Sequence, residues 1–172
     1  MEQAKAISLK NEKILYAIKF SVILALAIFA PMIKDQMITG TIVNALLFSS
    51  VFLLDFKGAL AIALFPSLVS LSTGLLPGAM VPMVPFIVLG NIILISVFSL
   101  LKGKNYGLAA ISASALKFVW LFSVSQLVMG LFVKESMATN IAAMMGLPQL
   151  FTALAGAVLA YIFVAKDQKI KN

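Results

Sequence analysis

The chain contains no cysteine and no histidine, and its 13 basic residues are all lysine. Without a thiolate or an imidazole, it lacks the usual ligands of zinc, iron, copper and iron–sulfur clusters. It also lacks a cysteine nucleophile and an imidazole general base. We therefore expect a protein that is not an enzyme and that holds neither a metal ion nor a cofactor.

Acidic residues are also scarce, and their positions exclude further chemistry. All six lie in the tails or at the ends of apolar runs: Glu2, Glu12, Asp35, Asp55, Glu135 and Asp167. No acid is therefore placed for a proton relay through a membrane or for hydrolysis by paired aspartates. A phosphate-binding loop of the Gly-x-x-x-x-Gly-Lys-Ser/Thr type is absent too, so uphill transport would need energy from a partner.

What the chain has in abundance is apolar sequence, which makes up 62% of its residues. A run of about 20 apolar residues can cross a bilayer. Six runs approach that length: 14–32, 38–54, 58–73, 86–101, 106–133 and 148–165. We predict an all-α, polytopic membrane protein in which residues 1–172 form one transmembrane domain, a compact six-helix bundle in the lipid bilayer.

The lysines indicate the orientation, because positive residues near span ends stay in the cytoplasm. With the N-terminus inside, only Lys34 and Lys134 lie outside, and nine lysines lie inside: Lys5, Lys10, Lys13, Lys57, Lys102, Lys104, Lys166, Lys169 and Lys171. Both termini are therefore predicted to be cytoplasmic. The net charge of +7 follows from this topology, and without arginine or interleaved aromatic residues it indicates no nucleic-acid partner.

Side-chain amides gather in the predicted outer half of the spans. They come from different helices: Gln36, Asn44, Asn91, Gln126 and Gln149. Amides are costly in lipid unless they face one another, water or a ligand, so this grouping predicts a polar cavity open to the outside. The alternative is a set of interhelical hydrogen bonds that only hold the bundle together.

Lys117, near the middle of the fifth span, is the sharpest candidate for a binding residue. No acid in any span could neutralise it, whereas a ligand carboxylate or phosphate could. Trp120 follows three residues later and could stack on the same ligand. Gln126 lies about 180° around a regular helix from Lys117, so the two side chains cannot share a face unless the helix breaks. Alternatively, Lys117 extends toward the cytoplasm or caps the carbonyls of a neighbouring helix.

The connection from Gly74 to Pro85, GLLPGAMVPMVP, carries no charge and also contains Pro77, Gly78 and Pro82. A regular helix cannot continue through it, yet its composition is too apolar for a solvated loop. We expect it to fold back over the outer mouth of the bundle as a gating loop.

Small residues recur every four positions on the first span, at Ala17, Ser21 and Ala25. Such a stripe allows the close approach of another helix. Either packing inside the bundle or docking of a partner protein would explain it.

Three stretches resemble the S component, the substrate-binding membrane subunit, of energy-coupling factor (ECF) transporters. They are ITGTIVNALLF (Ile38 to Phe48), FPSLVSLSTGLLPGAMVPMVPFIVLGN (Phe65 to Asn91) and MMGLPQLFTALAGA (Met144 to Ala157). The six short spans and the stripe on the first helix are similar as well. The resemblance covers most of the chain and is closest to a poorly characterised subgroup of bacterial proteins.

The resemblance implies a subunit of the bacterial cell (inner) membrane that binds a vitamin or a similar small micronutrient. It implies a transmembrane coupling protein and two cytoplasmic ATPases as partners. In that family an Ala-x-x-x-Ala motif on the first helix docks the coupling protein, which would correspond here to Ala17, Ser21 and Ala25. Nickel and cobalt are disfavoured as substrates, because members that transport them use a histidine-bearing N-terminus.

Two other functions remain open at this point. One is a structural or assembly subunit of a larger membrane complex, in which the small-residue stripes bind neighbours and the pocket is incidental. The other is a small stand-alone facilitator, which would need a polar path through both halves of the membrane. The inner half offers chiefly serines, so the facilitator is the weakest of the three.

Overall fold

The computed structural model describes residues 2–76, 78–132 and 142–169. Within these ranges the chain is helical and contains no strand. The elements are α1 (Glu2–Phe29), η1 (Ala30–Ile33), α2 (Gln36–Leu53), α3 (Phe56–Ser72), η2 (Gly78–Met83), α4 (Val84–Leu101), α5 (Tyr106–Phe132) and α7 (Leu147–Lys169).

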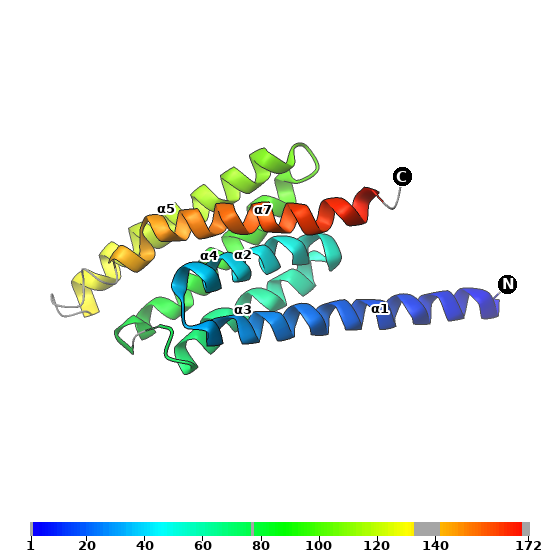
Figure 1. Cartoon of the computed structure of the whole chain (residues 1–172), viewed down its shortest axis with the longest axis horizontal. Coiled ribbons are helices and arrows are strands. Elements are labelled where there is room, and N and C mark those ends of the chain that lie inside the picture. Colours follow the sequence, from blue (N-terminus) through cyan, green and yellow to red (C-terminus); the bar gives the residue numbers. More distant parts are fainter. Residues whose placement is uncertain (1, 77, 133–141, 170–172) are drawn as a thin grey trace.

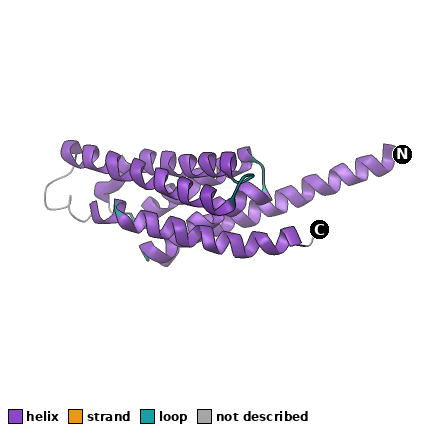
Figure 2. Ribbon diagram, turned by 90° about the horizontal axis from the view of Figure 1, so that it is seen from above, coloured by secondary structure: helices purple, strands orange, loops and turns teal. Residues whose placement is uncertain are grey.

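The helices run back and forth along one long axis (Figure 1). The start of α1 and the end of α7 lie at the same end of the molecule, which we call the terminal end. The opposite end, which we call the loop end, is formed by η1, η2 and residues 142–146. Seen from above, the first turns of α1 extend beyond the other helices (Figure 2). α2 packs most extensively against α7, and α4 packs against α5.

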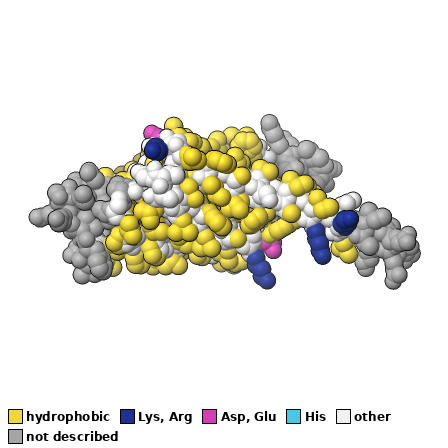
Figure 3. All heavy atoms as spheres, turned by 90° about the horizontal axis from the view of Figure 1, so that it is seen from below, with side chains coloured by type: hydrophobic (Ala, Val, Ile, Leu, Met, Phe, Trp, Pro, Cys, Tyr) yellow, Lys and Arg dark blue, Asp and Glu magenta, His cyan; other side chains and the backbone are white. Residues whose placement is uncertain are grey.

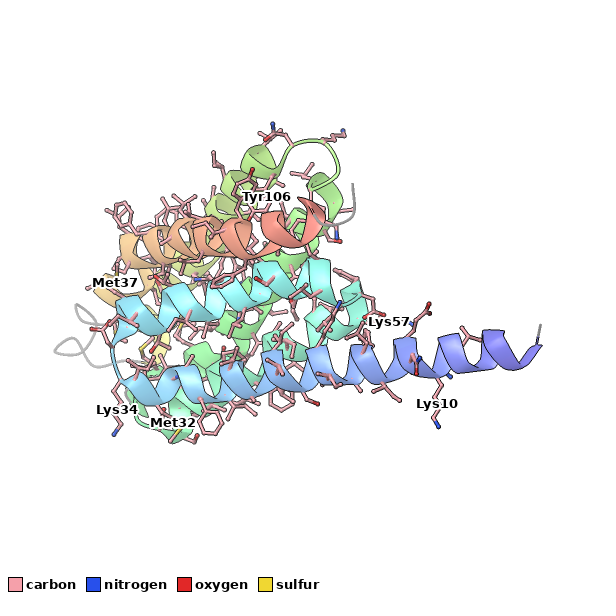
Figure 4. The ribbon with its side chains drawn as sticks, turned by 45° about the vertical axis from the view of Figure 1, so that its right-hand side comes forward. Lys10, Met32, Lys34, Met37, Lys57 and Tyr106 are labelled. Carbon is pink, nitrogen blue, oxygen red and sulfur yellow. The ribbon has the colours of Figure 1, made fainter. Side chains whose placement is uncertain are left out.

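The protein is a multi-pass helical membrane protein by length, composition and surface. Among the described residues, five helical stretches are long and apolar enough to cross a membrane, and α3 is a shorter apolar helix of 17 residues. Hydrophobic side chains cover most of the face in Figure 3, and the few charged ones project from its edges. Figure 4 places Lys34 at the loop end and Lys10 and Lys57 at the other end. The prediction of an all-α membrane bundle is confirmed.

The helix boundaries differ from the predicted runs for local reasons. α2 and α3 each begin two residues early, at Gln36 and Phe56. An aspartate caps each start: Asp35 Oδ1 accepts from the Ile38 N–H at 2.8 Å, and Asp55 Oδ1 accepts from the Gly58 N–H at 2.7 Å. Such caps satisfy N–H groups that have no helical partner.

The cap at α3 also joins α1 to the rest of the bundle. The Tyr16 hydroxyl donates to Asp55 Oδ1 at 2.9 Å. The Gly58 N–H and then this hydroxyl lower the pKa of the Asp55 carboxyl, because both bonds favour its ionised form. α1 begins well before residue 14, at Glu2, and so includes the polar sequence that precedes the apolar run. It ends at Phe29, and the 3-10 turn η1 follows with Pro31 in its first turn.

Two glycines allow α2 and α7 to approach closely. A Cβ atom on Gly156 would lie 2.7 Å from both Ala45 N and Asn44 Cβ, and one on Gly40 would lie 3.1 Å from Thr152 Cβ. Close approach of this kind is typical of helices that pack in membranes without large side chains between them. It holds Asn44 in the interior between the two helices.

Candidate functional site

A cavity of about 80 Å³ lies near the loop end of the bundle. Its walls come from α2, α3, α4, α5, α7 and the segments before α4 and α7. The polar residues that line it are Gln36, Thr39, Asn44, Ser67, Ser70, Asn91, Lys117 and Gln149. Four of the five amides predicted from the sequence, and Lys117, therefore meet at one place.

Lys117 lies at the centre of this polar group. Its Nζ donates to Asn44 Oδ1 at 2.7 Å and to Asn91 Oδ1 at 2.8 Å, so that one residue each from α2, α4 and α5 meet. All three side chains are almost fully buried, with Lys117 only 3% exposed. An ammonium group has three N–H donors. The third one has no acceptor among the described residues.

The two asparagines are held so that their oxygens face the lysine. Asn44 Nδ2 donates to the Gly40 carbonyl at 2.8 Å, and Asn91 Nδ2 donates to the Ala63 carbonyl at 3.2 Å. Because carbonyls accept from the nitrogen of each amide, its oxygen is left for an ammonium donor. The lysine is therefore positioned by two pre-oriented amides, which are in turn fixed by the backbone of α2 and α3.

The charge of Lys117 is not balanced by the acidic side chains that the structure describes. Glu12, Asp35 and Asp55 are all exposed, and the latter two are bonded to helix N-termini. A lysine near the centre of a membrane helix costs about 2.5–3.5 kcal/mol on insertion scales. Amide dipoles offset part of that cost, and a protonated Lys117 would give the site a positive charge.

At the loop end, two glutamines close one side of the cavity. Gln36 Nε2 and Gln149 Nε2 both donate to the Met144 carbonyl, at 2.9 and 3.1 Å. One backbone oxygen thereby joins the first turn of α2 to the start of α7. The segment around Met144 lines the cavity and is held in place by these two bonds.

The segment predicted as a gating loop also packs over this end. Gly74 adopts a positive φ of 76°, which turns the chain after α3. The Leu76 N–H donates to the Ser70 carbonyl at 3.0 Å, and Leu76 lines the cavity. Met80 and Met83 are fully buried against α5 residues such as Leu121.

The prolines and the second glycine of that segment have distinct positions. Gly78 begins η2 and Pro82 lies within it, whereas Pro85 lies in the first turn of α4, where proline suits the helix start. Pro77 lies outside the described residues.

The structure does not bring Trp120 and Gln126 into the site. The Trp120 indole N–H donates to the Phe86 carbonyl at 3.0 Å, and its ring packs beside the Phe86 ring at a centroid distance of 6.4 Å. Trp120 thus supports the start of α4 and does not line the cavity. Gln126 is exposed on the outer face of α5. Rotation about the α5 axis accounts for Gln126, which lies on the face opposite Lys117, whereas Trp120 is partly buried against the start of α4.

The small-residue stripe on α1 faces away from the bundle. Ala17, Ser21 and Ala25 are all exposed, whereas Ile23 and Ala27 of the same helix are buried. The stripe therefore does not mediate packing between the described helices of this chain.

Sequence reasoning missed several residues of the cavity wall. Ser67 and Ser70 lie three positions apart on α3 and face inward, whereas the apolar run 58–73 predicts only a membrane span. Their spacing within an apolar run was the available signal, because residues three apart share a helix face. Met144 and Met145 also line the cavity, and no polar pattern indicated them.

A larger and more open groove of about 550 Å³ lies between α5 and α7 toward the terminal end. Its lining is mostly apolar, and the Tyr106 hydroxyl there donates to the Ala157 carbonyl at 2.6 Å. No group of buried polar side chains converges on it, so the cavity at Lys117 is the better candidate site.

No family model, no curated protein and no solved structure matches this chain.

Proposed function

We propose that this protein is the substrate-binding membrane subunit of an ECF-type uptake transporter for a vitamin or a similar small micronutrient. The observation that carries the proposal is the polar cavity near one end of an apolar bundle, with Lys117 held by Asn44 and Asn91. The sequence resemblance to S components supports the same function. Capture would take place in this cavity, and partner ATPases would supply the energy.

The state of the polar groups favours binding over a purely structural role. If the network only held helices together, each N–H of Lys117 would be expected to have an acceptor, because unpaired polar groups in hydrocarbon cost several kcal/mol. Lys117 instead keeps one N–H free of described acceptors, and it borders open space. A ligand would complete its hydrogen bonding.

The distribution of lysine supports a cavity that faces the outside. Among the described residues, the loop end carries Lys34, whereas the terminal end and its connections carry Lys10, Lys13, Lys57, Lys102 and Lys104. Positive residues are retained on the cytoplasmic side. The loop end, and the cavity with it, would then lie outside.

The volume of the cavity supports a closed conformation. At about 80 Å³ it is smaller than the roughly 150 Å³ cavity that holds a benzene molecule, and far smaller than the roughly 300 Å³ of a typical ligand pocket. A vitamin would enter only if the segments around Leu76 and Met144 moved outward. These segments would act as the gate, and the two glutamine bonds to Met144 would hold it shut.

A structural or assembly subunit of a larger membrane complex is the second candidate. The exposed stripe of Ala17, Ser21 and Ala25 is compatible with it, because a helix of a neighbouring subunit could pack there. In the proposed transporter the same stripe would contact the transmembrane coupling protein.

Ligand-dependent thermal stabilisation tests the proposal. The purified protein, in lipid nanodiscs, is heated with and without each member of a panel of vitamins and their precursors. A true ligand at about 100 times its Kd stabilises the native state by about 2.7 kcal/mol. Stabilisation by one compound, and co-purification with ATPases, are expected. If the whole panel gives no shift and the protein co-purifies with an enzyme complex, the assembly function replaces this one.

A further inference from the structure

We infer that the ligand of this cavity is a small monocarboxylate whose carboxylate group binds Lys117 Nζ. This inference rests on the proposed function, since it assigns the chemical class of the solute that the same cavity would take. It is carried by the charge of the site, by the hydrogen-bond donors that remain free, and by the apolar wall near the mouth.

A protonated Lys117 would be the one charged group on the cavity lining, and no acid lies beside it among the described residues. Lys117 is bonded to two neutral amides, and the acidic side chains described by the structure are on the surface. A carboxylate carries one negative charge and would neutralise the ammonium group of Lys117 inside the bundle. A phosphate monoester carries about 1.5 to 2 negative charges at neutral pH and would leave an excess inside an apolar interior. A neutral ligand would leave Lys117 unbalanced.

Two groups on the cavity wall that have no acceptor among the described residues can donate, which suits a ligand group that only accepts. The third N–H of Lys117 is one of them. Ser67 is 3% exposed, lines the cavity and makes no hydrogen bond to another described residue. Ser70, by contrast, donates to the Pro66 carbonyl at 2.6 Å. An ionised carboxylate has two oxygens and no donor, so it could accept from Lys117 and from Ser67.

The asparagines cannot donate hydrogen bonds to the ligand without breaking the bonds that they already make. The amide nitrogens of Asn44 and Asn91 donate to the carbonyls of Gly40 and Ala63. Their oxygens accept from Lys117. They therefore position the ammonium group, and the ligand would approach it from the remaining side.

The body of the ligand would point toward the loop end. Asn44 lies eight residues further along α2 than Gln36, which is about 12 Å along a helix axis. Between these levels the wall includes Leu76, Ile87 and Met145. Gln36 and Gln149 lie at the same end, where they donate to the Met144 carbonyl. The rest of the wall there is mostly apolar, and it matches a ligand with an apolar body and one carboxylate at its tip.

Matched acid and amide pairs test the inference, because the two members differ mainly in charge. Binding of benzoate and benzamide, and of butyrate and butyramide, is measured calorimetrically on the full-length protein in lipid nanodiscs. The acids are titrated to about 10 mM, the range expected for ligands of so few atoms. We expect each acid to bind at least about tenfold more tightly than its amide, and Lys117→Met to remove this preference.

Two further variants make the result independent of the folding of Lys117→Met. Asn91→Asp places a carboxylate of the same shape beside Lys117 Nζ. It should abolish the preference for acids. Because an aspartate cannot donate to the Ala63 carbonyl as the Asn91 amide does, the unfolding temperature of this variant is measured alongside. Lys102→Met is the matched control: Lys102 donates to the Val51 carbonyl at 2.7 Å and does not line the cavity, so the preference should persist.

Equal binding of acid and amide, no binding of any acid, or a preference that survives both Lys117→Met and Asn91→Asp would overturn the inference. The proposed function would still stand if a micronutrient stabilised the protein independently of Lys117. Conversely, acid binding that depends on Lys117, with no stabilisation by any member of the vitamin panel, would support the carboxylate site and count against the micronutrient assignment.

Discussion

At the scale of the residue, Lys117 shows how a membrane interior accommodates a charge. Two amide oxygens at 2.7 and 2.8 Å replace part of its hydration, and carbonyls at Gly40 and Ala63 hold those amides in position. Each of these bonds is strengthened by the low dielectric of the interior. For the same reason, the loss of either amide would leave an ammonium donor unpaired.

Asn44→Leu should therefore destabilise the protein by at least about 1–3 kcal/mol, the cost of an unsatisfied buried group, which is higher when the group is charged. Thermal or denaturant unfolding in nanodiscs measures the change. Gln126→Leu is the control, since Gln126 is exposed on α5 and should stay within about 0.5 kcal/mol of the wild type. Equal stabilities for the two variants would show that the Asn44 bond to Lys117 contributes little.

At the scale of the element, the contact between α2 and α7 sets the position of Asn44. This pair of helices packs more extensively than the others, and Gly156 lies where a Cβ atom would meet the α2 backbone. The backbone of a packed helix moves less readily than the end of a side chain. Gly156 is thus a spacing residue for the cavity, although it does not line it.

Gly156→Ala should lower stability even though alanine favours a helix over glycine by about 1 kcal/mol. The added methyl would overlap Ala45 N and Asn44 Cβ, and overpacking of this kind costs about 1–3 kcal/mol. Thermal unfolding of the variant gives the sign. Ala155→Leu, one residue away on the exposed face of α7, should leave stability nearly unchanged. A more stable Gly156→Ala variant would contradict the close approach of the two helices.

At the scale of the whole molecule, opposite parts of the protein would perform different tasks. The cavity lies at the loop end in the interior, and the stripe of Ala17, Ser21 and Ala25 lies on the outer face of α1. α1 is also joined to the α2–α3 connection by the bond from Tyr16 to Asp55. Solute capture and partner docking would thus use separate surfaces of one bundle.

Ser21→Leu should weaken co-purification with a transmembrane coupling protein at least about tenfold, because a large side chain would hold the partner helix away from the stripe. The unfolding temperature and ligand binding should stay unchanged, since Ser21 is exposed. Leu127→Phe, at an exposed position on α5, is the control and should leave the complex intact. A complex that forms equally well with Ser21→Leu would exclude this stripe as the docking surface.

Much of the fold follows from local sequence. Apolar runs near the length of a bilayer crossing predicted the helices, and Asp35 and Asp55 explain where two of them begin. The amides at 36, 44, 91 and 149 were expected to share a cavity, and the structure places all four on one. Helix periodicity already placed Gln126 on the opposite face of α5 from Lys117. It could not predict that Trp120 donates to the Phe86 carbonyl, because that contact depends on what packs against α5.

The sequence by itself determined that this is a helical membrane protein with a lysine near the middle of one span, since a chain so apolar cannot hide its hydrophobic surface in water. Only the tertiary structure decided which groups surround that lysine. Asn44 and Asn91 are 73 and 26 residues from Lys117 along the chain. Their meeting depends on helix rotation and on the close contact of α2 with α7, which are set by packing among all the helices and not by any local pattern.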